Sequence, residues 1–203
     1  MANKVKFNIK NCHYAPVDSD GKYGTPIAMP GAVNLSLSVQ GELSKFYADG
    51  IAYYTSSSNG GYEGDLESAM VPDHFRKSVL GETEDGNGVL LENANVQPIT
   101  FAFGFEIDGD KKGTKFWFYN CSATRPNTEA ATKEDTIEPQ TDTITISCSP
   151  DDNGNVRVKS TETTNETVLA NWFNEVYVPS DDVDESVTPT PEPEPEAEEI
   201  EQG

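Results

Sequence analysis

Hydrophobic and polar residues alternate along most of residues 2–178, which is the pattern of β-strands that bury one face. The clearest runs place an apolar side chain at every second position, over residues 5–9, 33–39, 101–107 and 144–146. Turn sequences rich in Asp, Asn and Gly separate these runs. The alternation predicts a mainly β domain of eight to ten strands.

Two segments carry helical spacing instead. Residues 72–81 place Pro72 at the first helical position, Phe75 and Val79 one turn apart, and Gly81 as a stop. The second helix is expected to begin near Thr163, which forms a capping box with Glu166. Its apolar stripe consists of Val168, Leu169, Trp172, Phe173 and Val176. Both helices are expected to cover a sheet.

The character of the chain changes after Pro179, so we expect one domain over residues 1–179 and a tail over 180–203. The tail contains ten acidic residues, no basic residue and four prolines alternating with threonine and glutamate. Such a composition cannot bury enough apolar surface to offset the entropy lost on ordering. The segment is therefore predicted to be an extended, disordered acidic tail.

The charge of the chain excludes one class of function. The formal net charge is −21, and the domain without its tail still has 25 acidic residues against 14 basic ones. A body this acidic has no electrostatic footprint for gripping phosphates. Tight nucleic-acid binding is therefore not expected.

The sequence offers little material for catalysis or metal binding. It contains two histidines, and its three cysteines lack CxxC spacing, which argues against a disulfide scaffold and a zinc knuckle. The stretches DSDGKYG and DGDKKGT resemble the start of a calcium loop but lack oxygen ligands at required positions, so they are interpreted as hairpin turns. Glu63, Asp65 and Glu67 share one face of a predicted strand, which we interpret as a solvated face and not as a glycosidase pair. We expect no enzyme activity, no cofactor and no metal.

No apolar run has the length of a membrane helix, and the start of the chain lacks the apolar core of a signal peptide. The expectation is a protein that folds in the cytosol and has no membrane partner.

The stretch of residues 101–121, FAFGFEIDGDKKGTKFWFYNC, holds seven of the nineteen aromatic residues of the chain. Its first arm has one apolar face and, on the other, the small residues Ala102 and Gly104, which let something approach closely. Its second arm is apolar on both faces, with Trp117 and Tyr119 opposite the two phenylalanines. A strand with one wet face does not have this composition. Either a helix or another subunit must cover the second face.

A second aromatic region, residues 46–64, surrounds a long Gly- and Ser-rich turn. Tyrosine-rich flexible loops are typical of interfaces, because the ring buries area while the hydroxyl finds a partner. The alternative is an ordinary hairpin whose tyrosines lie in the core. From both regions we predict a subunit interface that contains Phe46, Tyr47, Tyr53, Tyr54, Tyr62, Trp117 and Tyr119.

Four blocks together carry a resemblance to a known family. They are FYADGIAYYTSSSNGGYEGDLESAMVPDHFRKSVLG, FAFGFEIDGDKKGTKFWFYNCSATRP, DTITISCSP and the terminal NWFNEVYVP. In this order they resemble the major tail protein, or tail tube protein, of siphophages that infect Gram-positive bacteria. The resemblance covers residues 2–179 and leaves out the acidic tail.

The resemblance implies an antiparallel β-sandwich or half-barrel with one or two flanking helices. It also implies a structural virion protein that assembles into rings, usually hexameric, which stack into a hollow tail tube for DNA. Expected partners are copies of the chain, the tape measure protein and the tail terminator and baseplate proteins, with DNA only in non-specific transit. The expected location is the virion tail, after synthesis in the bacterial host cytoplasm. An acidic lumen would let DNA slide without sticking.

Two other functions are weighed against this one. A carbohydrate-binding or adhesive β-sandwich would need exposed aromatic residues on a concave face. A glycan hydrolase would depend on Glu63 or Asp65.

Overall fold

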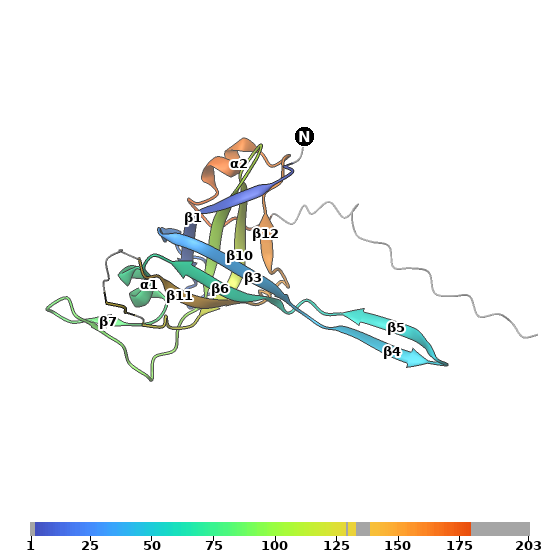
Figure 1. Cartoon of the computed structure of the whole chain (residues 1–203), viewed down its shortest axis with the longest axis horizontal. Helices are drawn as coiled ribbons and strands as arrows, with labels where there is room; N and C mark the ends of the chain where they lie inside the picture. The colour runs from blue at the N-terminus through green and yellow to red at the C-terminus, as the bar shows by residue number, and fades with distance from the viewer. Residues whose placement is uncertain (1–2, 129, 133–138, 180–203) are drawn as a thin grey trace, which may run out of the picture.

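A computed structural model describes residues 3–128, 130–132 and 139–179 of the protein, and it is mainly β, as the alternation predicts (Figure 1). The predicted tail over 180–203 lies outside the described residues. Two short helices accompany the strands, α1 (Asp73–Ser78) and α2 (Glu166–Asn171).

One antiparallel sheet forms the body of the molecule. Its strands follow the spatial order β2-β1-β9-β10-β11-β6-β3, and β12 also pairs with β10. The sheet curls into a half-barrel in which β1 and β3 approach each other (Figure 1), although no described hydrogen-bonded ladder joins them. The bounds are β1 (Lys6–Pro16), β2 (Ile27–Ala28), β3 (Ala32–Gln40), β6 (Gly61–Ser68), β9 (Phe101–Gly109), β10 (Thr114–Ala123), β11 (Asp142–Cys148) and β12 (Arg157–Lys159).

The concave side of this sheet holds the main core. Aromatic rings from the β9–β10 hairpin fill it, and the rings of Phe105 and Phe116 stack with their centroids 5.0 Å apart. The convex side of β9 and β10 carries a second, smaller core around Trp117 and Tyr119. The hairpin predicted over residues 101–121 is therefore confirmed, and both of its faces are packed.

Helix α1 closes one end of the main core, with Phe75 and Val79 fully buried as predicted. Pro72 is the N-cap of this helix and not its first helical residue, because the carbonyl of Pro72 already accepts the first helical hydrogen bonds. Gly81 has a φ of 77°, the left-handed conformation that ends a helix. A small two-stranded sheet follows, β7 (Thr83–Glu84) with β8 (Leu90–Leu91).

Strand β1 departs from simple alternation at two bulges, next to Asn8 and Asn11. Both asparagines have positive φ, a conformation that Asn tolerates better than most residues. The second bulge adds one residue to the strand, so Cys12 and Tyr14 enter the main core after Ile9, while His13 points to the convex side, where its ring stacks on Phe173. Cys12 and His13 thus point to opposite faces, as their adjacency on a strand predicts.

Candidate assembly surface

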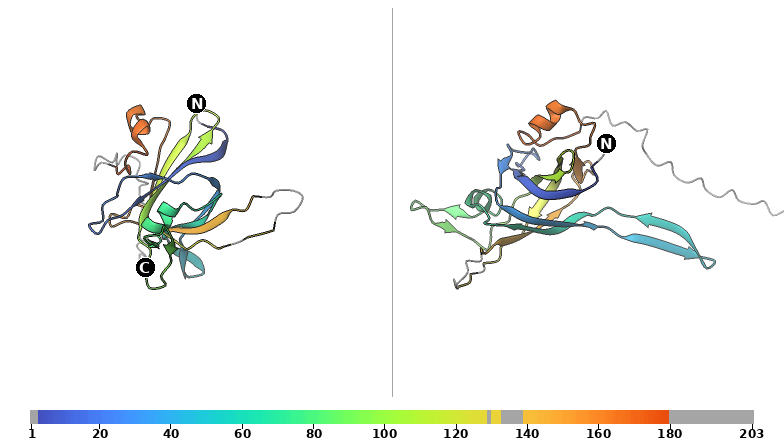
Figure 2. Two further views of the ribbon diagram at one scale, coloured as in Figure 1. Left: turned by 90° about the vertical axis from the view of Figure 1, so that its left-hand side faces the viewer. Right: turned by 45° about the horizontal axis from the view of Figure 1, so that its top comes forward.

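The largest exposed apolar element is a hairpin that leaves the body at the ends of β3 and β6 (Figures 1 and 2). It consists of β4 (Leu43–Ala48) and β5 (Ile51–Ser57), which form a separate two-stranded sheet. The two turn residues, Asp49 and Gly50, both have positive φ, at 51° and 80°. This is the backbone of a type I′ turn, whose twist matches that of the strands it joins, and Asp-Gly is one of its preferred sequences.

The hairpin carries apolar side chains that nothing in the described chain covers. Phe46 and Tyr54 are paired across the two strands, and a register shift after Phe46 leaves Tyr53 without a strand partner. The exposed fractions of the large apolar side chains lie between 61% and 71%, for Leu43, Phe46, Tyr47, Ile51, Tyr53 and Tyr54. An isolated two-stranded hairpin is marginally stable in water. A second surface that covers the hairpin would therefore stabilise it.

The base of the hairpin is held by the body. The amide of Ser58 donates to the carbonyl of Glu42 at 3.0 Å, and the amide of Gly60 donates to the carbonyl of Gln40 at 2.6 Å. Gly41 is required in this region, because a Cβ there would lie 2.2 Å from the Ser58 carbonyl oxygen. These contacts connect the ladder of β3 and β6 to that of β4 and β5, so the hairpin extends the body as one ribbon.

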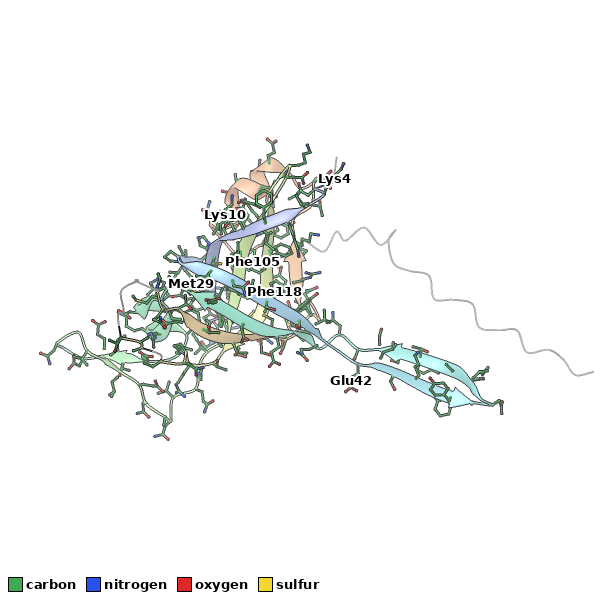
Figure 3. The ribbon with its side chains drawn as sticks, in the orientation of Figure 1. Lys4, Lys10, Met29, Glu42, Phe105 and Phe118 are labelled. Atoms are coloured by element: carbon green, nitrogen blue, oxygen red, sulfur yellow. The ribbon has the colours of Figure 1, made fainter. Side chains whose placement is uncertain are left out.

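A groove with a volume of about 490 Å³ opens between the first half of β1 and strand β3. Apolar side chains line both walls, with Phe7 and Ile9 on one side and Val33, Leu35 and Leu37 on the other, and polar residues such as Asn8 and Asn34 lie between them. Its floor includes Phe105 and Phe118, which Figure 3 labels in the region between the two strands. The predicted buried face of the first strand is thus only partly covered, since Phe7 is 54% exposed.

Tyr62 lies in the wall of this groove and not on the hairpin. Its ring packs edge-on against Phe118, with centroids 5.1 Å apart, and the guanidinium of Arg157 lies 5.1 Å from its centroid. The residue is half-buried. Together with Lys6, Arg157 supplies the charge of the groove lining, which contains no acidic residue.

Trp117 and Tyr119 do not belong to an exposed surface, so their predicted place in a subunit interface is wrong. Their exposed fractions are 0% and 2%, because the segment from α2 to Tyr177 covers them. The indole N–H of Trp117 donates to the carbonyl of Trp172 at 2.8 Å, and the hydroxyl of Tyr119 donates to the carbonyl of Tyr177 at 2.6 Å. Of the two covers that the sequence left open, the chain's own helical segment is the one present.

This covering segment is shorter as a helix than the sequence predicts. Helix α2 ends at Asn171. Trp172 and Val176 are buried, but they lie in the turns that follow the helix. The N-cap is Asn165, whose side chain accepts from the amide of Thr167 at 2.8 Å; the predicted capping box of Thr163 is not formed. At the other end, the ammonium of Lys115 donates to the carbonyl of Leu169 at 2.6 Å.

The outer face of β6 is acidic and exposed. Glu63 and Asp65 are exposed, and their neighbours in the ladders with β3 and β11 are serine and threonine residues. The hydroxyl of Thr145 donates to Asp65 at 2.8 Å. The carboxylates lie in a row along one strand of an open sheet, which is not the geometry of two carboxyl groups that face each other across a cleft. The arrangement fits the solvated face predicted from the sequence.

The two calcium-like stretches form backbone turns in the structure. The Asp18 carboxylate accepts from the amides of Asp20 and Lys22, both at 2.9 Å. The DGDKKGT stretch is the β9–β10 turn, and Asp110 in it accepts from the amide of Lys4 at 2.8 Å. Within the described ranges no group of three or more potential metal-ligating side chains comes together.

The three cysteines are buried in the main core. Burial raises the pKa of the Cys12 thiol to about 12 and the pKa of the Cys121 thiol well above its usual value. Cys121 and Cys148 are opposite each other in the β10–β11 ladder, with their sulfur atoms 2.8 Å apart, and both thiols are free. The sequence spacing of these two cysteines did not indicate that they are neighbours, because they lie 27 residues apart.

Neither a protein-family description nor a curated protein matches this chain. In the part of the chain that the structure describes, α1 and α2 have six residues each, and no helix has the length and hydropathy needed to cross a bilayer.

Proposed function

We propose that this protein is a structural subunit that assembles with copies of itself into stacked rings, forming the hollow tail tube through which phage DNA passes. The observation that carries the proposal is the β4–β5 hairpin, which exposes six large apolar side chains on a ribbon that the body holds in place. Exposed apolar surface of this kind marks interaction sites. The sequence resemblance to siphophage tail tube proteins supplies the type of assembly, including hexameric rings.

The charge distribution supports the same proposal. On the outer face of β6, the ladder neighbours of Glu63, Asp65 and Glu67 on β3 and β11 are serine and threonine residues and Asn34, and none of them is basic. Lining a channel with such a face would repel the DNA polyanion evenly and keep it from sticking. We therefore assign this face to the lumen of the proposed tube. The tape measure, tail terminator and baseplate proteins are proposed partners on the sequence resemblance alone.

Purified full-length protein tests the proposal. Light scattering after size-exclusion chromatography, together with negative-stain electron microscopy, should show rings or tubes that grow with protein concentration. The double substitution Tyr53→Ala and Tyr54→Ala should abolish them and leave the unfolding free energy within about 0.5 kcal/mol of wild type, because both side chains are exposed. Thr55→Ala, on the same exposed strand, is the matched control and should assemble normally.

A strictly monomeric wild type, across a wide concentration range and after seeding with preformed assemblies, would contradict the proposal. The carbohydrate-binding alternative predicts such a monomer with saturable affinity for cell-wall glycans. Four aromatic side chains on a projecting two-stranded ribbon favour self-assembly instead, since sugar binding uses a concave aromatic face.

A further inference from the structure

The groove between β1 and β3 is an uncovered, partly apolar surface whose charge is unusual for this protein. The chain has a net charge of −21, yet the groove lining contains two basic residues, Lys6 and Arg157, and no acidic one. The mouth of the groove is open, because Phe7 and Val33 on its two walls are 54% and 52% exposed. Such a groove is complementary to an apolar segment that has an acidic end.

The β4–β5 hairpin has that chemistry. Its apolar side chains are followed at the tip by Asp49, the basic residue of the hairpin, Lys45, lies back along β4, and the tip itself is a tight two-residue turn. The hairpin projects away from the body of its own chain (Figure 1), and its two strands form a sheet separate from that of the body. The hairpin that could occupy a groove therefore comes from another copy.

The walls of the groove also offer backbone hydrogen bonds. Strand β3 has a ladder with β6 on one side, and the first half of β1 has a ladder with β9 on one side. Neither wall is paired across the groove in the described structure. Free strand edges of this kind are templates for pairing with another chain.

We propose that the β1–β3 groove of one copy receives the apolar hairpin of a second copy. The inference rests on the proposed function, because it names the partner surface of the assembly hairpin. Hairpin and groove are two different surfaces of one chain, so the contact is heterologous. Repetition of a heterologous contact gives a closed ring or an open filament, which is the kind of growth that a tube requires.

Two variants, each defective in one of the two surfaces, test the pairing. The groove variant, Val33→Asp, places a carboxylate in the groove mouth, where it repels Asp49 of the incoming hairpin and removes the apolar contact of Val33. The hairpin variant is Tyr53→Ala with Tyr54→Ala. Each alone should associate with itself at least about 30-fold more weakly than wild type in analytical ultracentrifugation. Val39→Asp is the matched control, because Val39 is 65% exposed on the same strand but lies outside the groove lining, and it should assemble normally.

The decisive sample is an equimolar mixture of the two variants. Each mixed pair retains one intact hairpin and one intact groove, so the mixture should form heterodimers that do not grow further. Thermal melting checks that each variant folds; if Val33→Asp does not, Phe7→Asp on the opposite wall takes its place. Val33→Asp that assembles like wild type, or a mixture of folded variants without heterodimers, overturns the inference and assigns the groove to another occupant.

The outcomes for the groove and for the tube can be separated. Tubes formed equally by wild type and Val33→Asp would overturn the groove pairing and leave the tube proposal intact. Heterodimers from the mixture, with wild-type protein that forms only short open chains, would support the pairing and overturn the tube proposal. Wild-type protein that does not self-associate at any concentration overturns both.

Discussion

Gly104 determines how closely Trp117 can pack against the convex face of β9. The two residues are paired across the β9–β10 hairpin, and a Cβ at position 104 would lie 2.6 Å from the indole ring. The ring cannot move away easily, because its N–H donates to the carbonyl of Trp172. One missing side chain thus allows the largest aromatic residue to be buried and allows the α2 segment to lie close to the sheet.

Gly104→Ala should therefore destabilise the protein by about 1–3 kcal/mol, the usual cost of overpacking a filled core. Urea unfolding monitored by tryptophan fluorescence would measure the change. Gly86→Ala is the control, since its Cβ would have no neighbour within 4 Å and the backbone there is not left-handed. Equal stability of Gly104→Ala and wild type would mean that the second core has room that the structure does not show.

Buried thiol and phenol groups make stability sensitive to alkaline pH. Burial raises the pKa of Cys12 and of Tyr23 to about 12 each, and it raises the pKa of Cys121 and Tyr119 as well. These groups stay protonated in the folded protein while the unfolded chain releases the same protons at lower pH. By linkage, stability is full below the unfolded-state pKa and is lost as pH rises toward the folded-state value.

We therefore expect the unfolding free energy to fall from about pH 9 upward, by about 1.4 kcal/mol per pH unit for each proton that only the unfolded chain releases. Urea titrations at pH 7 to 11 would measure the slope. Cys12→Ala should make the slope between pH 9 and 11 shallower, whatever its effect on stability at pH 7. An unchanged slope in this variant would show that the Cys12 thiol does not contribute.

At the scale of elements, the alternation along the chain was sufficient to predict the strands. It also predicted the β9–β10 hairpin and the apolar residues on both faces of that hairpin. The reason is that residues 101–121 carry strong local signals, with period-two phenylalanines on either side of a Gly-rich turn. The bulges in β1 were not predicted, because an asparagine with positive φ leaves no mark on hydrophobic periodicity. The extent of α2 was overestimated because Trp172 and Val176 continue its apolar spacing after the helix has ended.

The candidate surface was predicted only in part for a related reason. An aromatic residue at a strand position is equally compatible with a core and with an interface, and tertiary packing decides between them. Phe46, Tyr47, Tyr53 and Tyr54 lie on a hairpin that the described body does not cover, whereas a segment more than fifty residues away covers Trp117 and Tyr119. The groove could not be predicted, because it depends on how far the curled sheet brings β1 toward β3.

At the scale of the whole molecule, the acidic face of β6 lets the proposed lumen be tested by its charge. Glu63→Lys with Asp65→Lys should spare assembly, because both side chains are exposed on the face opposite the main core. Short double-stranded DNA should then co-sediment with the variant tubes at low salt and be released as salt rises, since phosphate contacts by lysine are screened by counterions. Wild-type tubes should not retain DNA.

The control variant, Asp20→Lys with Asp152→Lys, makes the same change of charge at exposed positions elsewhere. Equal DNA retention by both variants would indicate that net charge alone decides, and loss of assembly in the β6 variant would mean that this face is a subunit contact and cannot line the channel.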